Sequence, residues 1–262
     1  MKLKIKTCSI ALTVALLMLF AYSLPCFAGD TTAHNWYVVN NDDHTVPVLE
    51  KQMSFIEKYD GYYANKNVKS GDKVVYLTFD AGYENGNVAK ILDVLKSHNA
   101  HGAFFILKNI ILRNGDVVQR MTDEGHLVCN HTANHPDMSG ITDRKMFEKQ
   151  LAMLDSAYNE LTGREMAKVY RPPEGRFTEQ NLEYAKELGY KTVFWSFAYA
   201  DWDNNKQPDP DKALEKILAH VHNGEIMLLH PTSATNAAIL DQLLTRLERD
   251  GYRFGSLEEL WT

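Results

Sequence analysis

The feature of this sequence that most constrains its fold is a regular alternation of apolar and amphipathic segments from Lys73 onward. The apolar segments have the length of buried strands, and the segments between them carry apolar residues at helical spacing. Strands that alternate with helices form a parallel sheet covered by helices, which is either doubly wound or closed into a barrel. We expect strands at residues 74–79, 101–107, 125–130, 168–170, 191–195 and 225–229, and helices at residues 85–97, 116–124, 143–162, 178–188, 211–221 and 235–249.

Polar side chains follow the expected strands at the points where these strands end. The carboxyl ends of the strands of a parallel barrel open on one face, and active sites lie on that face. Side chains that are far apart in the sequence are therefore expected to converge on one mouth. They are Asp80, His131, Arg171, Ser196 with Asp201, and His230.

Two of these positions have the chemistry of a base and of a metal site. Asp80 stands in the segment TFDAGY at a strand end, where it acts as a general base or a metal ligand, or else caps the next helix. His131 and His135 stand four residues apart in HTANH, a spacing that places two imidazoles on one metal ion. With ten histidines in the chain such a pair also arises by chance, but its place directly after a strand favours a metal site.

Three further segments supply charge and an apolar wall. Arg171 opens the rigid turn RPPEG, and a permanent charge directly after a buried strand indicates a carboxylate partner, although a surface turn is the alternative. AYADW joins Asp201 to Trp202, whose indole lines the site or belongs to the core. His230 ends the last strand, and an imidazole there suits proton donation, with a structural role as the alternative.

The first 28 residues are arranged as a secretory signal peptide. They begin with basic residues, continue with an apolar run from Cys8 to Tyr22, and end in small residues up to Ala28. An uncleaved membrane anchor is the alternative, and either reading places the protein outside the cytoplasm. Cys129 is the one cysteine that remains after cleavage, so we expect no internal disulfide and a fold stabilised by its core.

The net charge limits the possible partners. The chain holds 34 acidic and 28 basic side chains, a formal charge of −6, and loss of the basic leader makes it more negative. Such a balance repels phosphate backbones, so we expect no nucleic-acid partner, and we infer no protein partner.

Residues 29–72 form a segment rich in aromatic side chains, which need a surface to pack on. We expect this appendage to wrap around a catalytic domain of residues 73–262.

Five motifs in order, TFDAG, HTANH, RPPEG, AYADW and LLH, resemble those of the NodB-homology polysaccharide deacetylases of carbohydrate esterase family 4. Within that family the segments TFDAGYENG, GHLVCNHTANHPD, RPPEGRFT and GYKTVFWSFAYADWD resemble the sporulation enzymes that deacetylate N-acetylmuramic acid in peptidoglycan. The resemblance implies a deformed (β/α) barrel. It also implies hydrolysis of the acetyl groups of peptidoglycan glycan strands for muramic δ-lactam in the spore cortex, in the cell wall or the spore intermembrane space.

The resemblance assigns the acid–base chemistry residue by residue. Asp80 matches the general base that activates water, and Arg171 matches the arginine that keeps this base ionised and oriented. His230 matches the general acid that protonates the departing amine. Asp201 matches the acid that supports either the arginine or the acid histidine.

The resemblance also assigns the metal, the oxyanion site and the acetyl pocket. His131 and His135 match histidines that bind a divalent metal, for which we expect zinc. The backbone N–H of Glu174 matches the oxyanion donor. Trp202 and Leu228 match the wall of the acetyl pocket.

The chain departs from the family pattern at two positions. Ala81 stands where most members carry a second Asp as third metal ligand, so metal binding is expected to be weak, differently completed or absent. Glu174 stands where relatives often carry an aromatic or basic residue, and an acid there opposes a lactyl carboxylate. We expect Arg176, two residues on, to compensate by binding that carboxylate.

Two alternative functions remain at this point. The first is deacetylation of N-acetylglucosamine in peptidoglycan or chitin-like chains. The second is a glycan-binding module without catalysis, which the presence of Asp80, Arg171 and His230 together disfavours, since binding requires no acid and base.

Overall fold

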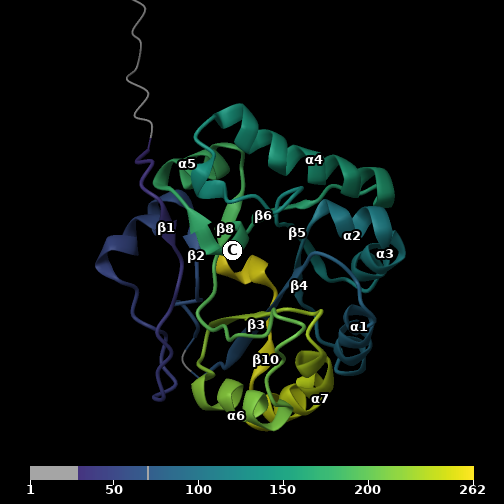
Figure 1. Ribbon diagram of the computed structural model, residues 1–262. Coiled ribbons are helices and arrows are strands. Elements are labelled where there is room, and N and C mark those ends of the chain that lie inside the picture. The colour runs from purple at the N-terminus through teal and green to yellow at the C-terminus, as the bar shows by residue number, and fades with distance from the viewer. Residues whose placement is uncertain (1–28, 70) are drawn as a thin grey trace, which may run out of the picture.

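The alternation of strands and helices predicted from the sequence is present in the structure, a computed structural model that describes residues 29–69 and 71–262 (Figure 1). The expected signal peptide of residues 1–28 lies outside the described residues. The strands are β1 (His34–Asn35), β2 (Gly61–Tyr62), β3 (Val74–Ala81), β4 (Ala103–Ile106), β5 (Leu127–Asn130), β6 (Ala167–Tyr170), β7 (Arg176–Phe177), β8 (Lys191–Val193), β9 (Glu225–Leu229) and β10 (Arg253–Phe254). The α-helices are α1 (Asn87–Ser97), α2 (Lys108–Arg113), α3 (Gly115–Asp123), α4 (Arg144–Thr162), α5 (Glu179–Glu187), α6 (Pro210–His220) and α7 (Ala234–Arg249).

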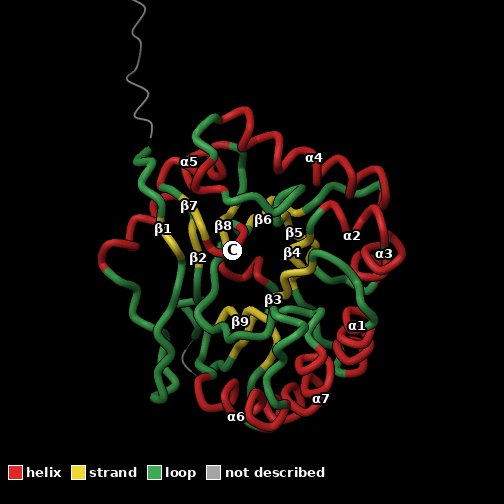
Figure 2. The backbone as a smooth tube through the Cα atoms, in the orientation of Figure 1, coloured by secondary structure: helices red, strands yellow, loops and turns green. Residues whose placement is uncertain are grey.

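The main sheet is parallel and curls into a deformed (β/α) barrel with the helices outside it (Figure 2). Its strands follow the order β10-β3-β4-β5-β6-β8-β2, and β9 pairs with the other side of β3. Side chains alternate along β3 between the two faces. Val75, Leu77 and Phe79 pack toward the helices, whereas Val74 and Tyr76 belong to the cluster that fills the barrel.

The barrel closes between the segment after β8 and strand β9. The backbone N–H of Leu228 donates to the carbonyl of Phe197 over 2.9 Å, and that of Ser196 donates to the carbonyl of Ile226 over 3.0 Å. Strand β8 therefore ends at Val193, two residues earlier than predicted, because the chain turns there to reach β9.

Residues 29–69 do more than pack on the outside of the barrel. Strand β2 pairs in parallel with β8, and Ala64 forms an isolated bridge with Glu225 at the start of β9. This segment therefore fills the seam between β8 and β9 on the side opposite the active face. The indole of Trp36 stacks on Phe194 with ring centroids 4.4 Å apart, which anchors the segment to the sheet.

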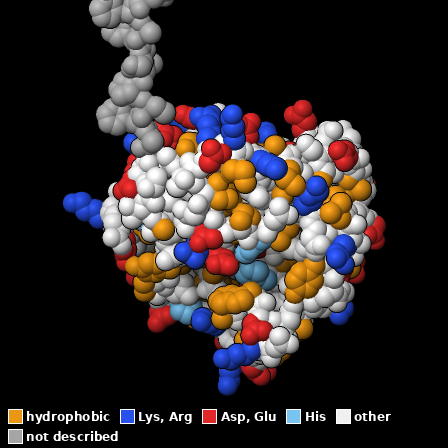
Figure 3. Space-filling model, turned by 45° about the horizontal axis from the view of Figure 1, so that its top comes forward, with side chains coloured by type: hydrophobic (Ala, Val, Ile, Leu, Met, Phe, Trp, Pro, Cys, Tyr) orange, Lys and Arg blue, Asp and Glu red, His pale blue; other side chains and the backbone are white. Residues whose placement is uncertain are grey.

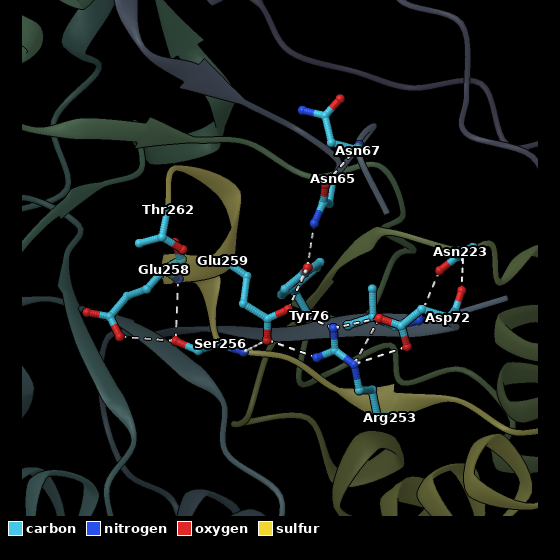
Figure 4. A network of polar contacts seen from close by, with 11 residues as sticks. Asn65, Asn67, Asp72, Tyr76, Asn223, Arg253, Ser256, Glu258, Glu259 and Thr262 are labelled. Carbon is cyan, nitrogen blue, oxygen red and sulfur yellow. Dashed lines mark hydrogen bonds and ion pairs between the residues drawn. The ribbon is translucent and has the colours of Figure 1, made fainter. Parts of the chain in front are cut away.

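The amino-terminal end of the barrel is closed by the end of the chain, which Figure 1 shows at the centre of the ring of strands. The 3₁₀-helix Leu257–Leu260 and the following Trp261 pack against the interior cluster. Arg253 holds this helix to the barrel, with one guanidinium nitrogen 2.9 Å from Asp72 and 2.8 Å from Glu259 (Figure 4). The opposite end, where the strands finish, remains for the functional site.

The α-helices agree with the sequence prediction except at one position, and the 3₁₀-helix Lys51–Tyr59 in the appendage was not predicted. Helix α2 was not predicted; it lies between β4 and α3 and contacts α4. Within residues 29–69 and 71–262, none of the helices combines the length and apolar character needed to cross a bilayer.

Candidate active site

A cavity of about 790 Å³ lies where the barrel strands end. Figure 3 shows histidine side chains in a hollow bordered by hydrophobic groups on this face. Of the residues expected to converge on one mouth, Arg171 and Asp201 bind cavity residues without lining the cavity themselves. Ser196 is buried and accepts a hydrogen bond from the backbone N–H of Ile226 over 3.1 Å. Seven of the residues predicted from the sequence line the cavity itself. They are Asp80, His131, His135, Glu174, Trp202, Leu228 and His230.

Asp80 and Arg171 form a buried ion pair at the floor of the cavity. Asp80 Oδ1 accepts a hydrogen bond from Arg171 Nη1 over 2.8 Å. Arg171 is fully buried, whereas a tenth of the Asp80 side chain is exposed. The carboxylate is therefore open to a reactant on one side while its countercharge is shielded from water.

Nε and Nη2 of Arg171 are also bound, which fixes the guanidinium in one position. Its Nε donates to the carbonyl of Val193 over 3.0 Å, and its Nη2 donates to Thr78 Oγ1 over 3.0 Å and to the carbonyl of Phe194 over 3.1 Å. The guanidinium carbon also lies 4.0 Å from the centre of the Phe105 ring. A fork of donors held in this way orients its carboxylate partner rigidly.

The electrostatic surroundings keep Asp80 ionised. Burial alone raises the pKa of this carboxyl, but the charge of Arg171, followed by His131 and His230, outweighs burial and lowers the pKa below its ordinary value. A carboxylate that stays ionised and faces a cavity is able to accept a proton from water.

His131 and His135 lie side by side in the cavity wall, with ring centroids 5.1 Å apart. His131 Nδ1 contacts the backbone oxygen of Arg171 at 2.9 Å, so this nitrogen carries the proton and Nε2 keeps its lone pair. His131 Nε2 lies 3.6 Å from Asp80 Oδ2. Burial lowers the pKa of His131 to about 4, so the ring is neutral at neutral pH, as a metal ligand must be.

The third donor of a typical metal site is missing from the described residues. No group of three or more His, Cys, Asp or Glu side chains in residues 29–69 and 71–262 is placed to hold a metal ion. Ala81 is fully buried and packs with the apolar cluster between the sheet and the helices. The two imidazoles therefore fit a weakly held divalent ion and do not form a complete site of the usual three protein ligands.

The turn that carries Glu174 is strained. Glu174 has a φ of 56°, in the left-handed region that costs a residue with a side chain about 1 kcal/mol. The next residue, Gly175, has a φ of 66°, and a Cβ there would lie 2.9 Å from both Trp195 and Trp36. The turn is therefore held by the appendage and the sheet, which places Glu174 on the cavity wall.

His230 and Asp201 form the second charged pair of the cavity. Asp201 is buried, and its Oδ1 lies 2.7 Å from His230 Nδ1. Burial alone lowers the pKa of His230, but the hydrogen bond and charge of Asp201 and the charge of Asp80 outweigh burial and raise it above the ordinary value. Asp201 thus supports the histidine, one of the two partners that the sequence left open.

Trp202 and Leu228 both line the cavity, and their assignment to the wall of an acetyl pocket stays a prediction. Trp202 is 62% exposed, and its ring stands edge-on to that of His230 with centroids 6.2 Å apart. It is therefore a wall of the site and not a core residue.

Arg176 does not have the position that the sequence suggested. Its guanidinium pairs with Asp137 at 3.0 Å, and Arg176 is not among the residues that line the cavity. Strand β7, which begins at Arg176, is held antiparallel to β1 by the pairing of Arg176 with Asn35. The expected compensation of Glu174 by Arg176 is therefore not seen in the cavity.

Several lining residues were not predicted. Gly82, Ala198 and Tyr199 stand inside quoted motifs, and Leu107 and Asn109 lie outside all five motifs. None of these side chains signals a role in the sequence, and only the fold shows that they face the cavity. The lining residues that were not predicted are Gly82, Tyr83, Leu107, Asn109, Trp195, Ala198, Tyr199 and Thr232.

Comparisons with known proteins identify the family of this chain. The polysaccharide deacetylase family matches residues 67–193. The chain is 40% identical over 227 residues to the peptidoglycan N-acetylmuramic acid deacetylase PdaA of Bacillus subtilis, an alignment that spans 86% of this chain and 85% of the relative.

Solved structures show the same fold. The structure of B. subtilis PdaA, a family 4 carbohydrate esterase, matches with a TM-score of 0.84 at 38% identity and covers 88% of this chain and 97% of its own. A family 4 carbohydrate esterase from Bacillus anthracis matches with a TM-score of 0.73 at 34% identity over 89% and 98% of the two chains. The chain belongs to the polysaccharide deacetylases of carbohydrate esterase family 4, hydrolases that act on amide C–N bonds.

Proposed function

We propose that this protein removes the acetyl group from N-acetylmuramic acid in peptidoglycan glycan strands, releasing acetate and a free amine. The observation that carries the proposal is an ionised base, Asp80, and a proton donor, His230, on the walls of one cavity, each held by a buried charged partner. The substrate follows from the similarity to the peptidoglycan N-acetylmuramic acid deacetylase of B. subtilis, which is 40% identical. We extend the proposal to muramic δ-lactam formation in the spore cortex and to an exported protein.

The reaction begins at Asp80. The carboxylate takes a proton from water while the water oxygen bonds to the acetyl carbon, which gives a tetrahedral oxyanion. Arg171 binds Asp80 Oδ1 and leaves Oδ2 as the acceptor of that proton. The backbone N–H of Glu174, in its strained turn on the cavity wall, stabilises the oxyanion.

The reaction ends at His230. With Nδ1 occupied by Asp201, the protonated ring presents Nε2–H to the sugar nitrogen. The C–N bond breaks as this proton moves to nitrogen, so the products are acetate and the amine. Trp202 and Leu228 enclose the acetyl methyl group.

Enzymes of this family depend on a metal, and His131 and His135 are the residues that would hold it here. A divalent ion, for which we propose zinc, supplies polarisation of the acetyl oxygen when bound. Two imidazoles without a third protein ligand imply that it is easily removed.

N-acetylglucosamine in peptidoglycan or chitin-like chains is the second candidate substrate, and one observation favours it. The described lining of the cavity contains no Lys or Arg, and it includes the exposed Glu174. Such a lining suits a neutral sugar better than a free lactyl carboxylate.

One digest decides between the candidates. Peptidoglycan with stem peptides and strands freed of them are incubated with the protein, digested to small fragments and analysed by mass spectrometry, with acetate measured in parallel. Deacetylated muramic acid supports the proposal, and deacetylated glucosamine alone supports the second candidate. Binding without acetate release supports a non-catalytic glycan-binding module.

A further inference from the structure

Asn236, in the first turn of α7, joins the two members of the second charged pair. It is buried, and its Nδ2 donates to Asp201 Oδ2 over 2.6 Å and to the backbone oxygen of His230 over 3.0 Å. Its Oδ1 accepts a hydrogen bond from the hydroxyl of Tyr199. One amide thus contacts the carboxylate, the backbone of the proton donor and a residue of the cavity wall.

A second asparagine of the chain, Asn181, stands at the same position of its helix and shows what this residue normally does. Asn181 and Asn236 both stand three residues after a capping hydroxyl, to which their backbone N–H groups donate over 3.0 Å and 3.1 Å. The side chain of Asn181 folds back and accepts from the N–H of its own capping residue, Thr178. The side chain of Asn236 instead reaches Asp201 and His230, so it does not serve its own helix.

The chemistry of its partners fixes the amide in one orientation. An ionised carboxylate and a backbone carbonyl accept hydrogen bonds and donate none, so the NH₂ group must face Asp201 and His230. The hydroxyl of Tyr199 donates to the oxygen on the other side. An aspartate has the same shape but presents an acceptor where Asn236 presents a donor.

We propose that Asn236 is a positioning residue for proton donation by His230. By holding Asp201 Oδ2 and the His230 backbone together, it keeps Asp201 Oδ1 against Nδ1 and directs Nε2 into the cavity. This inference rests on the proposed function for its catalytic consequence, but the geometry of the pair is testable without catalysis. The charged groups that face His230 are Asp201, Asp80 and Arg171.

Two variants of nearly equal size separate positioning from packing. Asn236→Leu removes the donor, and we expect kcat to fall about tenfold or more with KM nearly unchanged. The free energy of a hydrogen bond to a charged group corresponds to a change in rate of about that size. Asn236→Asp places a second buried carboxyl beside Asp201, which raises the pKa of the introduced group. Its protonated form donates as the amide does, so activity should persist at low pH and be lost as pH rises through that pKa.

The matched control is Asn181→Leu, which removes a buried amide from the same helix position away from the cavity. It should lower thermal stability and leave the pH profile of kcat in place. The second readout is the pKa of the His230 imidazole by NMR, assigned with His230→Gln. We expect it to be lower in Asn236→Leu than in the wild type, because Asp201 is no longer held against Nδ1.

Wild-type kcat and pH profiles in both Asn236 variants, or an unchanged pKa of His230 in Asn236→Leu, overturn the inference. If the wild-type protein releases no acetate from any glycan, the proposed function fails. In that case the NMR titration still decides whether Asn236 holds the pair.

Discussion

His230 and Asp201 meet through two hydrogen bonds to one carboxylate: the ring nitrogen Nδ1 lies 2.7 Å from Oδ1, and the backbone N–H donates to Oδ2 over 2.8 Å. The histidine is therefore held by its ring and by its backbone and cannot rotate without breaking a bond to a charged group. Asp80 is bound to Arg171 in a comparable way through one oxygen. The acid and the base of the cavity are each oriented before a substrate arrives.

The first prediction concerns the base. Asp80→Asn should lower the rate of acetate release at least ~10²-fold, as loss of a positioned base does. It should also lower the melting temperature, because it leaves the fully buried Arg171 without its countercharge. Asp137→Asn removes the carboxylate partner of the partly exposed Arg176 and serves as control, with activity close to the wild type. Near-full acetate release by Asp80→Asn contradicts the assignment of the base.

The second prediction concerns pH. Asp80 must be ionised, and its pKa is lowered below the ordinary value; His131 must be neutral to bind a metal, and its pKa is about 4. Activity should therefore persist to about pH 4 on the acid side and be lost below it, first as His131 takes up a proton and then as Asp80 does. His230 must be protonated and its pKa is raised above the ordinary histidine value, so activity should be lost on the basic side as pH rises through that raised pKa.

Asp201→Asn removes the largest contribution that raises the pKa of His230, so the basic limb should move to lower pH. A kcat profile measured from acid to alkaline pH on both proteins checks this. If kcat falls at the same alkaline pH in both proteins, the titration of another group limits the rate on the alkaline side.

The sequence predicted the ends of β5, β6 and β9 correctly, because each is a short strand followed directly by a polar residue. Strand β3 runs two residues further than predicted, to Ala81, so Asp80 lies within its paired residues and not after them. The parallel arrangement alone then brings Asp80, His131 and His230 to one face. These positions depend on local pattern and on one topological rule.

Other features of the site depend on contacts that local pattern does not encode. Arg176 pairs with Asp137 because β7 is held beside β1, a pairing that joins distant segments. Asn236 looks like an ordinary polar residue in the first turn of a helix, and only the packing of α7 against the loop of Asp201 shows its role. The strand β2 is too short to be recognised from the sequence.

The third prediction tests the turn that carries Glu174. Gly175→Ala should destabilise the protein and reduce acetate release, since its Cβ would lie 2.9 Å from Trp195 and Trp36. Gly163→Ala is the control, because Gly163 has a φ of 67°, close to that of Gly175, and nothing lies within 4 Å of its Cβ position. The free energy of unfolding of that control should fall by about 1 kcal/mol, and its rate of acetate release should stay that of the wild type. Equal behaviour of the two variants in thermal unfolding and in acetate release argues against a strained functional turn.

The fourth prediction concerns substrate charge. If the muramyl lactyl carboxylate enters the cavity free, Glu174 opposes it and no cation in the described lining offsets this charge. Glu174→Gln should then raise kcat/KM about threefold on strands freed of stem peptides at low salt, and the gain should shrink as salt screens the charge. A neutral chitooligosaccharide should show no change. An equal change on both substrates assigns the effect to the turn and not to charge.

The last prediction concerns the metal, where the family and the described residues differ. His131 and His135 provide two donors, and Ala81 provides none. We expect chelation to lower activity and added zinc to restore it, and His131→Ala and His135→Ala to lower it permanently. Ala81→Asp buries a carboxylate in an apolar cluster, so it should lower the melting temperature without metal, and zinc should raise it more than in the wild type. Full activity in excess chelator with no bound metal, or active histidine variants, refutes the metal site. The two imidazoles would then orient water beside Asp80, and the Glu174 N–H would stabilise the oxyanion alone.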